Sequence, residues 1–68
     1  MGKRVIVRTM SNVTYIGEVS NQNLFHEQGI AVRPNPELAM EIFVPEEEVR
    51  EIIFEVNSLT YREFMKLL

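Results

Sequence analysis

The chain has 68 residues, a net charge of −3 and no cysteine, and these features exclude several classes of protein. A chain of this length forms a single small domain, here residues 1–68, whose core alone is marginal. The absence of cysteine excludes disulfides and thiolate metal sites, so we expect self-association to reinforce the fold and no cofactor to be bound. No apolar run approaches the ~20 residues of a transmembrane helix and no secretory signal is visible, which predicts a cytoplasmic protein without membrane contact.

The sequence predicts five short strands, between about residues 4 and 56, followed by a C-terminal helix. β-branched residues dominate the first two strands, which flank Ser11-Asn12 and therefore form a hairpin. Pro34-Asn35-Pro36 and Pro45 interrupt ladder pairing and separate the later strands. The expected strands are residues 4–10, 13–20, 29–33, 38–44 and 49–56.

The last part of the chain changes from a strand period to a helix period. Thr60 followed by Glu63 is a capping box. The apolar residues at i, i+3, i+4 and i+7 are Tyr61, Phe64, Met65 and Leu68. This pattern predicts an amphipathic helix over residues 59–68. Two turns are too few to stand alone in water, so the apolar stripe must pack on the strands or on a neighbouring chain.

Gly17 lies in the middle of the long second strand, where a residue without a side chain weakens a sheet. Five short strands in a flat open sheet would expose an apolar face, and a strongly bent sheet avoids this by closing into a small barrel. Such a bend needs a residue without a Cβ atom. We therefore predict a mostly β fold, a five-stranded SH3-like barrel in which Gly17 lets the second strand curl around the core.

The residues around Gly17 follow a spaced motif. Asn12 precedes Gly17 by five positions, and Val19 follows it by two. The positions six, eight, ten and thirteen residues after Gly17 are Asn23, Phe25, Glu27 and Ile30. With these residues and the segment from Val44 to Ile52, the chain resembles the Sm-like family (Sm, LSm and bacterial Hfq). The resemblance covers residues 4–56 and implies a strongly bent five-stranded barrel, a homo-oligomeric ring and binding to single-stranded RNA.

Some positions depart from the family pattern. Asn23 keeps an acceptor without the charge of the family's usual aspartate, and Phe25 keeps a stacking surface. Glu27 places a carboxylate where the family has an amide, and Pro45-Glu46 replaces its Arg-Gly pair. A C-terminal helix stands in place of the family's N-terminal one.

The resemblance implies a nucleic-acid site in which Phe25 stacks on a base. The residues expected to supply polar contacts are Asn21, Asn23, His26 and Arg33. Alternatively, Phe25 packs in the core and His26 is exposed. The basic residues of the first half of the chain have the same ambiguity: they form a phosphate-contacting patch, or they are solvated strand positions paired with glutamates. These residues are Lys3, Arg4, Arg8 and Arg33.

Catalysis has little support, because no nucleophile lies near His26 and carboxylates such as Glu41 and Glu51 are not tied to a pocket. The Glu46–Glu48 run matches no calcium loop and is expected to be a solvated turn. We therefore expect a non-enzymatic protein that forms a ring with itself, pairing the apolar edges 38–44 and 49–56, and binds single-stranded RNA or DNA. The alternative is an oligomeric scaffold or adaptor that contacts protein, which the acidic second half favours.

Overall fold

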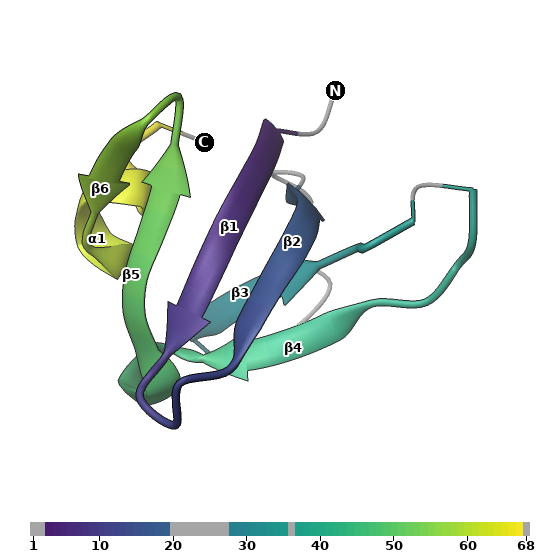
Figure 1. Cartoon of the computed structure of the whole chain (residues 1–68), viewed down its shortest axis with the longest axis horizontal. Helices are drawn as coiled ribbons and strands as arrows, with labels where there is room; N and C mark the ends of the chain where they lie inside the picture. Colours follow the sequence, from purple (N-terminus) through teal and green to yellow (C-terminus); the bar gives the residue numbers. More distant parts are fainter. Residues whose placement is uncertain (1–2, 20–27, 36, 68) are drawn as a thin grey trace.

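A computed structural model of the chain describes residues 3–19, 28–35 and 37–67. These residues form six strands, a short 3₁₀ helix and a short α-helix (Figure 1). The strands are β1 (Lys3–Thr9), β2 (Thr14–Val19), β3 (Gly29–Val32), β4 (Ile42–Pro45), β5 (Val49–Phe54) and β6 (Asn57–Leu59). The helices are η1 (Glu46–Glu48) and α1 (Tyr61–Met65). No helix in this described part of the chain is long and apolar enough to span a membrane.

The strands form two antiparallel sheets. The larger has the order β2-β1-β5-β6, and the smaller pairs β3 with β4. A single bridge between Glu18 and Arg33 joins β2 to the residue that follows β3. The mostly β fold with one short helix is therefore confirmed, whereas the closed barrel of five strands is not: the described residues make two open sheets with six strands.

The segment predicted as one strand over residues 49–56 is two strands joined by a tight turn. β5 ends at Phe54, and the chain reverses through Glu55 and Val56 into β6. Both turn residues have positive φ, 51° and 61°, as a two-residue hairpin of type I′ requires. This turn could not be predicted from the sequence, because glutamate and valine are not residues that favour left-handed backbone.

The segment predicted as a strand over residues 38–44 pairs only from Ile42 onwards. The partner strand β3 is four residues long, and its last residue, Val32, faces Ile42. Residues 37–41 therefore precede the ladder and have no strand assignment. They belong to a long connection between β3 and β4 that projects from the body of the molecule (Figure 1).

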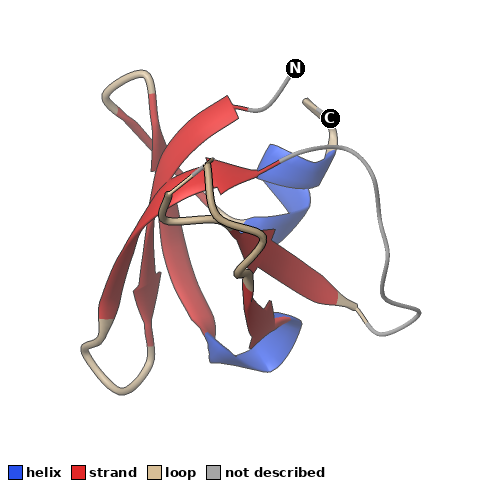
Figure 2. Ribbon diagram, turned by 90° about the vertical axis from the view of Figure 1, so that its right-hand side faces the viewer, coloured by secondary structure: helices blue, strands red, loops and turns tan. Residues whose placement is uncertain are grey.

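The core lies between the sheets and is completed by the C-terminal helix. The inward residues of β1, Val5 and Val7, are buried, and Phe64 of α1 is fully buried among them. The Phe64 ring meets the edge of the Phe54 ring at a centroid distance of 5.9 Å. Figure 2 shows η1 at the base of the molecule and α1 higher, against the strands. The helix thus packs on its own chain, as one of the two sequence expectations required.

The capping box at the start of α1 is confirmed. The Glu63 N–H donates to Thr60 Oγ1 at 3.1 Å, and the Thr60 N–H donates to Glu63 Oε1 at 2.8 Å. The helix is shorter than expected, because the α-helical residues are Tyr61–Met65. Leu68, which was expected to extend the apolar stripe, lies outside the described residues.

Gly17 is needed where the chain of β2 passes close to the end of β3. A Cβ atom on Gly17 would collide with the Arg33 carbonyl oxygen, and would lie 2.7 Å from the Arg33 carbonyl carbon and 2.9 Å from Pro34 Cα. These are backbone atoms, so a side chain at residue 17 would force the two sheets apart. The structure therefore assigns Gly17 a role in the close approach of two backbone segments, whereas the sequence predicted that it lets the strand curl around the core.

We predict that Gly17→Ala lowers the free energy of unfolding by more than about 1 kcal/mol, the whole span of the β-propensity scale. The physical reason is the collision with Arg33 and Pro34. Urea or thermal unfolding measures the change, and Thr14→Val, at an exposed position of the same strand, should stay within roughly 0.5 kcal/mol of the parent. Equal stability of Gly17→Ala and the parent would show that the two segments do not need this contact.

We predict that Val56→Gly raises the free energy of unfolding by roughly 1 kcal/mol, because a β-branched residue at positive φ is strained and glycine is not. Val56 has φ 61° and is 97% exposed, so the substitution removes little packing. Asn57→Gly, one residue later in β6, is the matched control and should be destabilising. If both variants lose the same stability in thermal melts, the turn is not strained.

Candidate functional site

Most of the predicted nucleic-acid site falls on undescribed residues. Asn21, Asn23, Phe25 and His26 lie in the stretch 20–27, outside the described residues. Arg33 is described, and it sits opposite Glu18 in the bridge that links the sheets. Val19, the last residue of β2, immediately precedes the stretch 20–27 in the chain.

The Arg33 side chain is held on one side and open on the other. Its Nη2 lies 3.7 Å from Glu41 Oε2, and the two side chains are 41% and 20% exposed. Its Nε is buried and has no hydrogen-bond partner among the described residues. Arg33 is therefore partly neutralised by Glu41 but still presents part of its guanidinium to solvent.

The other predicted basic residues do not form one patch with Arg33. Arg8 Nη1 lies 3.2 Å from Glu51 Oε2, and Lys3 Nζ stands 5.4 Å from the centre of the Phe54 ring. Arg4 and Arg8 lie on opposite sides of Ile6 along β1. The arrangement fits the second interpretation of these residues, solvated strand positions that pair with neighbouring groups, better than a continuous surface for phosphates.

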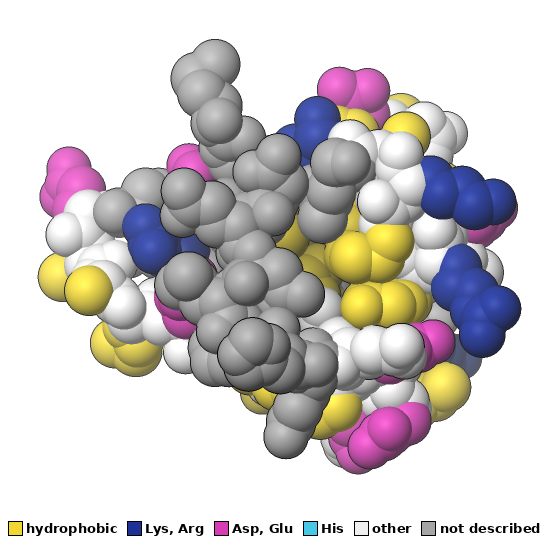
Figure 3. All heavy atoms as spheres, turned by 180° about the vertical axis from the view of Figure 1, so that it is seen from behind, with side chains coloured by type: hydrophobic (Ala, Val, Ile, Leu, Met, Phe, Trp, Pro, Cys, Tyr) yellow, Lys and Arg dark blue, Asp and Glu magenta, His cyan; other side chains and the backbone are white. Residues whose placement is uncertain are grey.

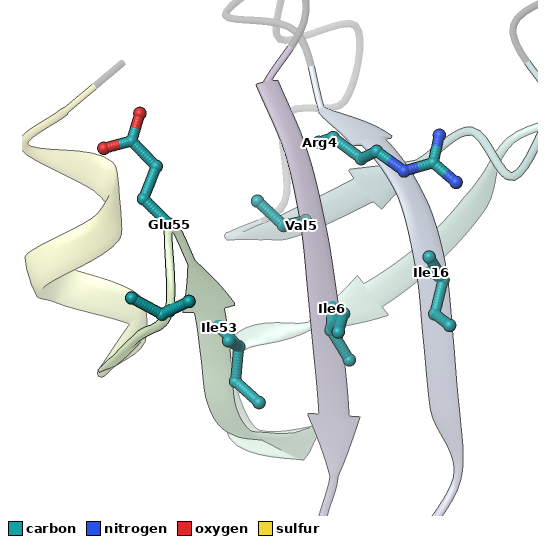
Figure 4. Close-up of a pocket in the computed structure, with 7 residues that line it drawn as sticks. Arg4, Val5, Ile6, Ile16, Ile53 and Glu55 are labelled. Carbon is teal, nitrogen blue, oxygen red and sulfur yellow. The ribbon is translucent and has the colours of Figure 1, made fainter.

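The outer face of the large sheet carries a row of isoleucines. β1 alternates, with Val5 and Val7 buried and Ile6 turned outward between them. Ile6 is paired with Ile16 of β2 on one side and with Ile53 of β5 on the other. Figure 4 shows the three isoleucine side chains side by side across the strands. We call this surface, with its flanking charged residues, the outer face.

A shallow groove of about 300 Å³ opens at one end of the outer face. β1, β2 and β5 line it with Arg4, Val5 and the isoleucine row, and the turn after β5 lines it with Glu55 and Val56. Figure 4 shows Arg4 and Glu55 pointing away from each other, so neither side chain closes the groove. Val5 is 2% exposed and forms its floor.

A second exposed apolar surface lies on the connection between β3 and β4, residues 34–41, which we call the arm. Leu38 and Met40 are 51% and 61% exposed. The arm is shaped at Asn35, whose Oδ1 accepts from the Glu37 N–H at 3.0 Å and whose carbonyl oxygen accepts from the Leu38 N–H at 3.0 Å. Figure 3 shows hydrophobic side chains exposed on the left, the side to which the arm projects.

The strand that follows the arm is an edge. Among the described strands, β4 pairs with β3 alone. An edge strand offers unpaired backbone N–H and C=O groups to another chain. The arm and β4 therefore present exposed apolar side chains and a strand edge in one continuous stretch of the chain.

The described carboxylates do not gather into a metal site, and several of them are paired with neighbouring groups. The described residues contain no group of three or more His, Cys, Asp or Glu side chains that could hold a metal ion. Glu41 is paired with Arg33, and Glu51 with Arg8 and with the Ser58 hydroxyl at 2.7 Å. Glu46 of η1 lies 3.9 Å from Arg62, so the predicted acidic turn is tied to the helix.

The outer face was not recognised as a functional surface in the sequence, although a signal for it exists. Outward positions of strands with one solvated face are usually polar, and isoleucine occupies this position in β1, β2 and β5. The register of the three strands must be known before the isoleucines can be placed side by side.

Comparison of the chain with models of protein families, with curated proteins and with solved structures finds no match.

Proposed function

We propose that this protein is a non-enzymatic adaptor that binds another polypeptide through the arm and the edge of β4, which pairs with β3 alone among the described strands. The observation that supports this function is the exposure of Leu38 and Met40 directly before an edge strand. Edge strands bind extended segments through main-chain hydrogen bonds, and alternate side chains then provide specificity. Leu38 and Met40 alternate in this manner, and methionine adapts to irregular partners.

The partner segment should extend the sheet and carry positive charge. Glu37 and Glu41 flank the two apolar residues of the arm, and Glu41 has a single arginine beside it, Arg33. An arriving strand with apolar residues at alternate positions and a lysine or arginine nearby would match both features. A segment with the reverse charge would be repelled.

A second copy of the chain is one source of such a strand, which is the basis for the homo-oligomeric ring. The expected acceptor was the edge of residues 49–56, and β6 covers the part of that edge from Ile52 to Phe54. We propose β6 as the acceptor, since it pairs with β5 alone among the described strands. Through the Glu18–Arg33 bridge, the strands follow one continuous order, β4-β3-β2-β1-β5-β6. This order supports a divergent Sm-like module as the building block of the proposed ring.

Single-stranded RNA is the second candidate ligand, favoured by the position of Arg33. This residue is bridged to Glu18 next to the end of β2, where the stretch that contains Phe25 begins. Arginine side chains and aromatic rings are both used to bind single strands, and Arg33 presents part of its guanidinium to solvent. The pairing of Arg8 and Arg33 with glutamates places this candidate second.

We predict that the double substitution Leu38→Ser and Met40→Ser abolishes or strongly weakens binding at the β4 edge while preserving the fold, because both side chains are exposed. Sedimentation velocity from low micromolar to submillimolar concentration measures self-assembly, and selection from a displayed peptide library measures binding of other segments. Leu67→Ser, at another exposed leucine, is the control. Assembly and peptide binding that ignore the double substitution would remove the arm from the proposal.

We predict that, if RNA is bound, Phe25→Ala weakens binding to short oligonucleotides by roughly 1–3 kcal/mol, the typical value of a base stacked on a ring. Lys3→Ala should have a smaller effect, because Lys3 lies beside Phe54. Fluorescence polarisation with U-rich and A-rich oligonucleotides at two salt concentrations measures both. Absence of binding by the parent at tens of micromolar would eliminate the RNA candidate and leave the adaptor unaffected.

A further inference from the structure

The outward side chains of β1 and β5 have opposite charges at matched positions. β1 presents Arg4, Ile6 and Arg8, whereas β5 and the turn after it present Glu51, Ile53 and Glu55. The strand register places Ile6 opposite Ile53 and Arg8 opposite Glu51, and beyond the last paired residues Arg4 and Glu55 line the same groove. One strand is therefore Arg-Ile-Arg on its outer side, and its neighbour is Glu-Ile-Glu.

The charges at the two ends of this pattern are used differently. At one end of the pattern, Arg8 and Glu51 pair within the chain at 3.2 Å. At the other end, Arg4 and Glu55 have no ion-pair partner within 4.0 Å among the described residues, and the open groove lies between them. Beside the groove, Val56 is 97% exposed at a positive φ that strains a β-branched residue. Exposed charges of both signs thus border a partly exposed apolar row.

We propose that the outer face is a self-complementary docking surface for a second copy of this chain. A two-fold axis parallel to the strands and midway between β1 and β5 places β1 of one copy over β5 of the other. Ile6 then faces Ile53 of the second copy, and Arg4 faces its Glu55. Arg8 of each copy faces Glu51 of the other in the same way. The two Arg8–Glu51 ion pairs, one from each copy, then merge into a network of four charges. Each contact occurs twice, as an isologous interface requires.

The charge pattern favours this position of the two-fold axis over the positions next to it. A two-fold axis that passes through β1 itself would place Arg4 on Arg4 and Arg8 on Arg8, and like charges in contact are strongly unfavourable. An axis between β1 and β2 would match Arg4 with Glu18 but leave Glu51 without a cation from the second copy. Face-to-face sheets pack with their strands nearly aligned, which is the geometry that the axis between β1 and β5 produces.

The size of the outer face predicts a weak and reversible dimer. Four strands about 4.8 Å apart and up to seven residues long at about 3.3 Å each cover roughly 20 by 23 Å. This is about half of the ~800 Å² that a standard interface takes from each partner. We therefore expect association in the micromolar range or weaker. The surface does not include the arm or the edge of β4, so the dimer and the adaptor function stand or fall separately.

The test is a charge exchange measured by sedimentation equilibrium, with the arm substitutions Leu38→Ser and Met40→Ser present in every variant to remove edge pairing. We expect Arg4→Glu to weaken the dimer by roughly tenfold or more, because Glu would face Glu55 of the second copy. Glu55→Arg should weaken it equally. The double variant Arg4→Glu with Glu55→Arg should restore the affinity of the chain that carries the arm substitutions alone, since the two signs are exchanged together. Arg62→Glu, at an exposed arginine of α1, is the matched control and should leave the dimer unchanged.

Two further measurements make the outcome decisive. In the parent, concentration-dependent NMR shifts should be largest at Ile6, Ile16 and Ile53, and Ile53→Ser should remove them while thermal melts show a folded chain. Added salt should weaken the dimer, because its rim is made of ion pairs. A chain with the arm substitutions that stays monomeric at submillimolar concentration would overturn the proposal. A dimer that the charge exchange fails to restore, or that Arg62→Glu disrupts as much as Arg4→Glu, would overturn it as well.

Discussion

Two backbone hydrogen bonds between Glu18 and Arg33, each 2.9 Å long, hold the two sheets in their relative position. Within the described residues, this bridge is the sole strand pairing between the sheets, and it requires the neighbouring Gly17 to have no side chain. The bridge lies at Arg33, where β3 ends and the connection to β4 begins, and the same residue lies beside Glu41.

The central position of β1 then divides the molecule into an inner and an outer side. Because β1 pairs with β2 and β5, its alternate residues face the core or the solvent across the middle of the large sheet. Val5, Val7 and Thr9 are buried on one side, and Phe64 from the C-terminal helix packs in the same core. The other side keeps its isoleucines at the surface. The core is thus completed by a helix on the inner side, while the isoleucine row on the outer side stays partly exposed.

Local features were predictable from the sequence, and features that depend on register were not. The hairpin at Ser11-Asn12 and the capping box at Thr60 are encoded by residues that are close in the chain, and Asn12 has the positive φ of 64° that such a turn needs. The turn at Glu55 and Val56 lacks any turn residue, so the sequence extended β5 through it. The start of β4 is set by the short length of β3, a distant segment. The proposed nucleic-acid residues could be evaluated only at Arg33, because the other four lie outside the described residues.

The pairing of β1 with β5 also has a kinetic consequence. Arg8 and Glu51 are 43 residues apart in the chain, so the centre of the large sheet forms through a contact between distant segments. The loop between the two segments must close before this contact can contribute to stability, and the entropy lost in closing it slows folding. The folding time of sheets with such distant contacts therefore lies toward the millisecond-to-second range. During synthesis, the hairpin of β1 and β2 emerges before β5, so one edge of β1 stays unpaired until β5 arrives.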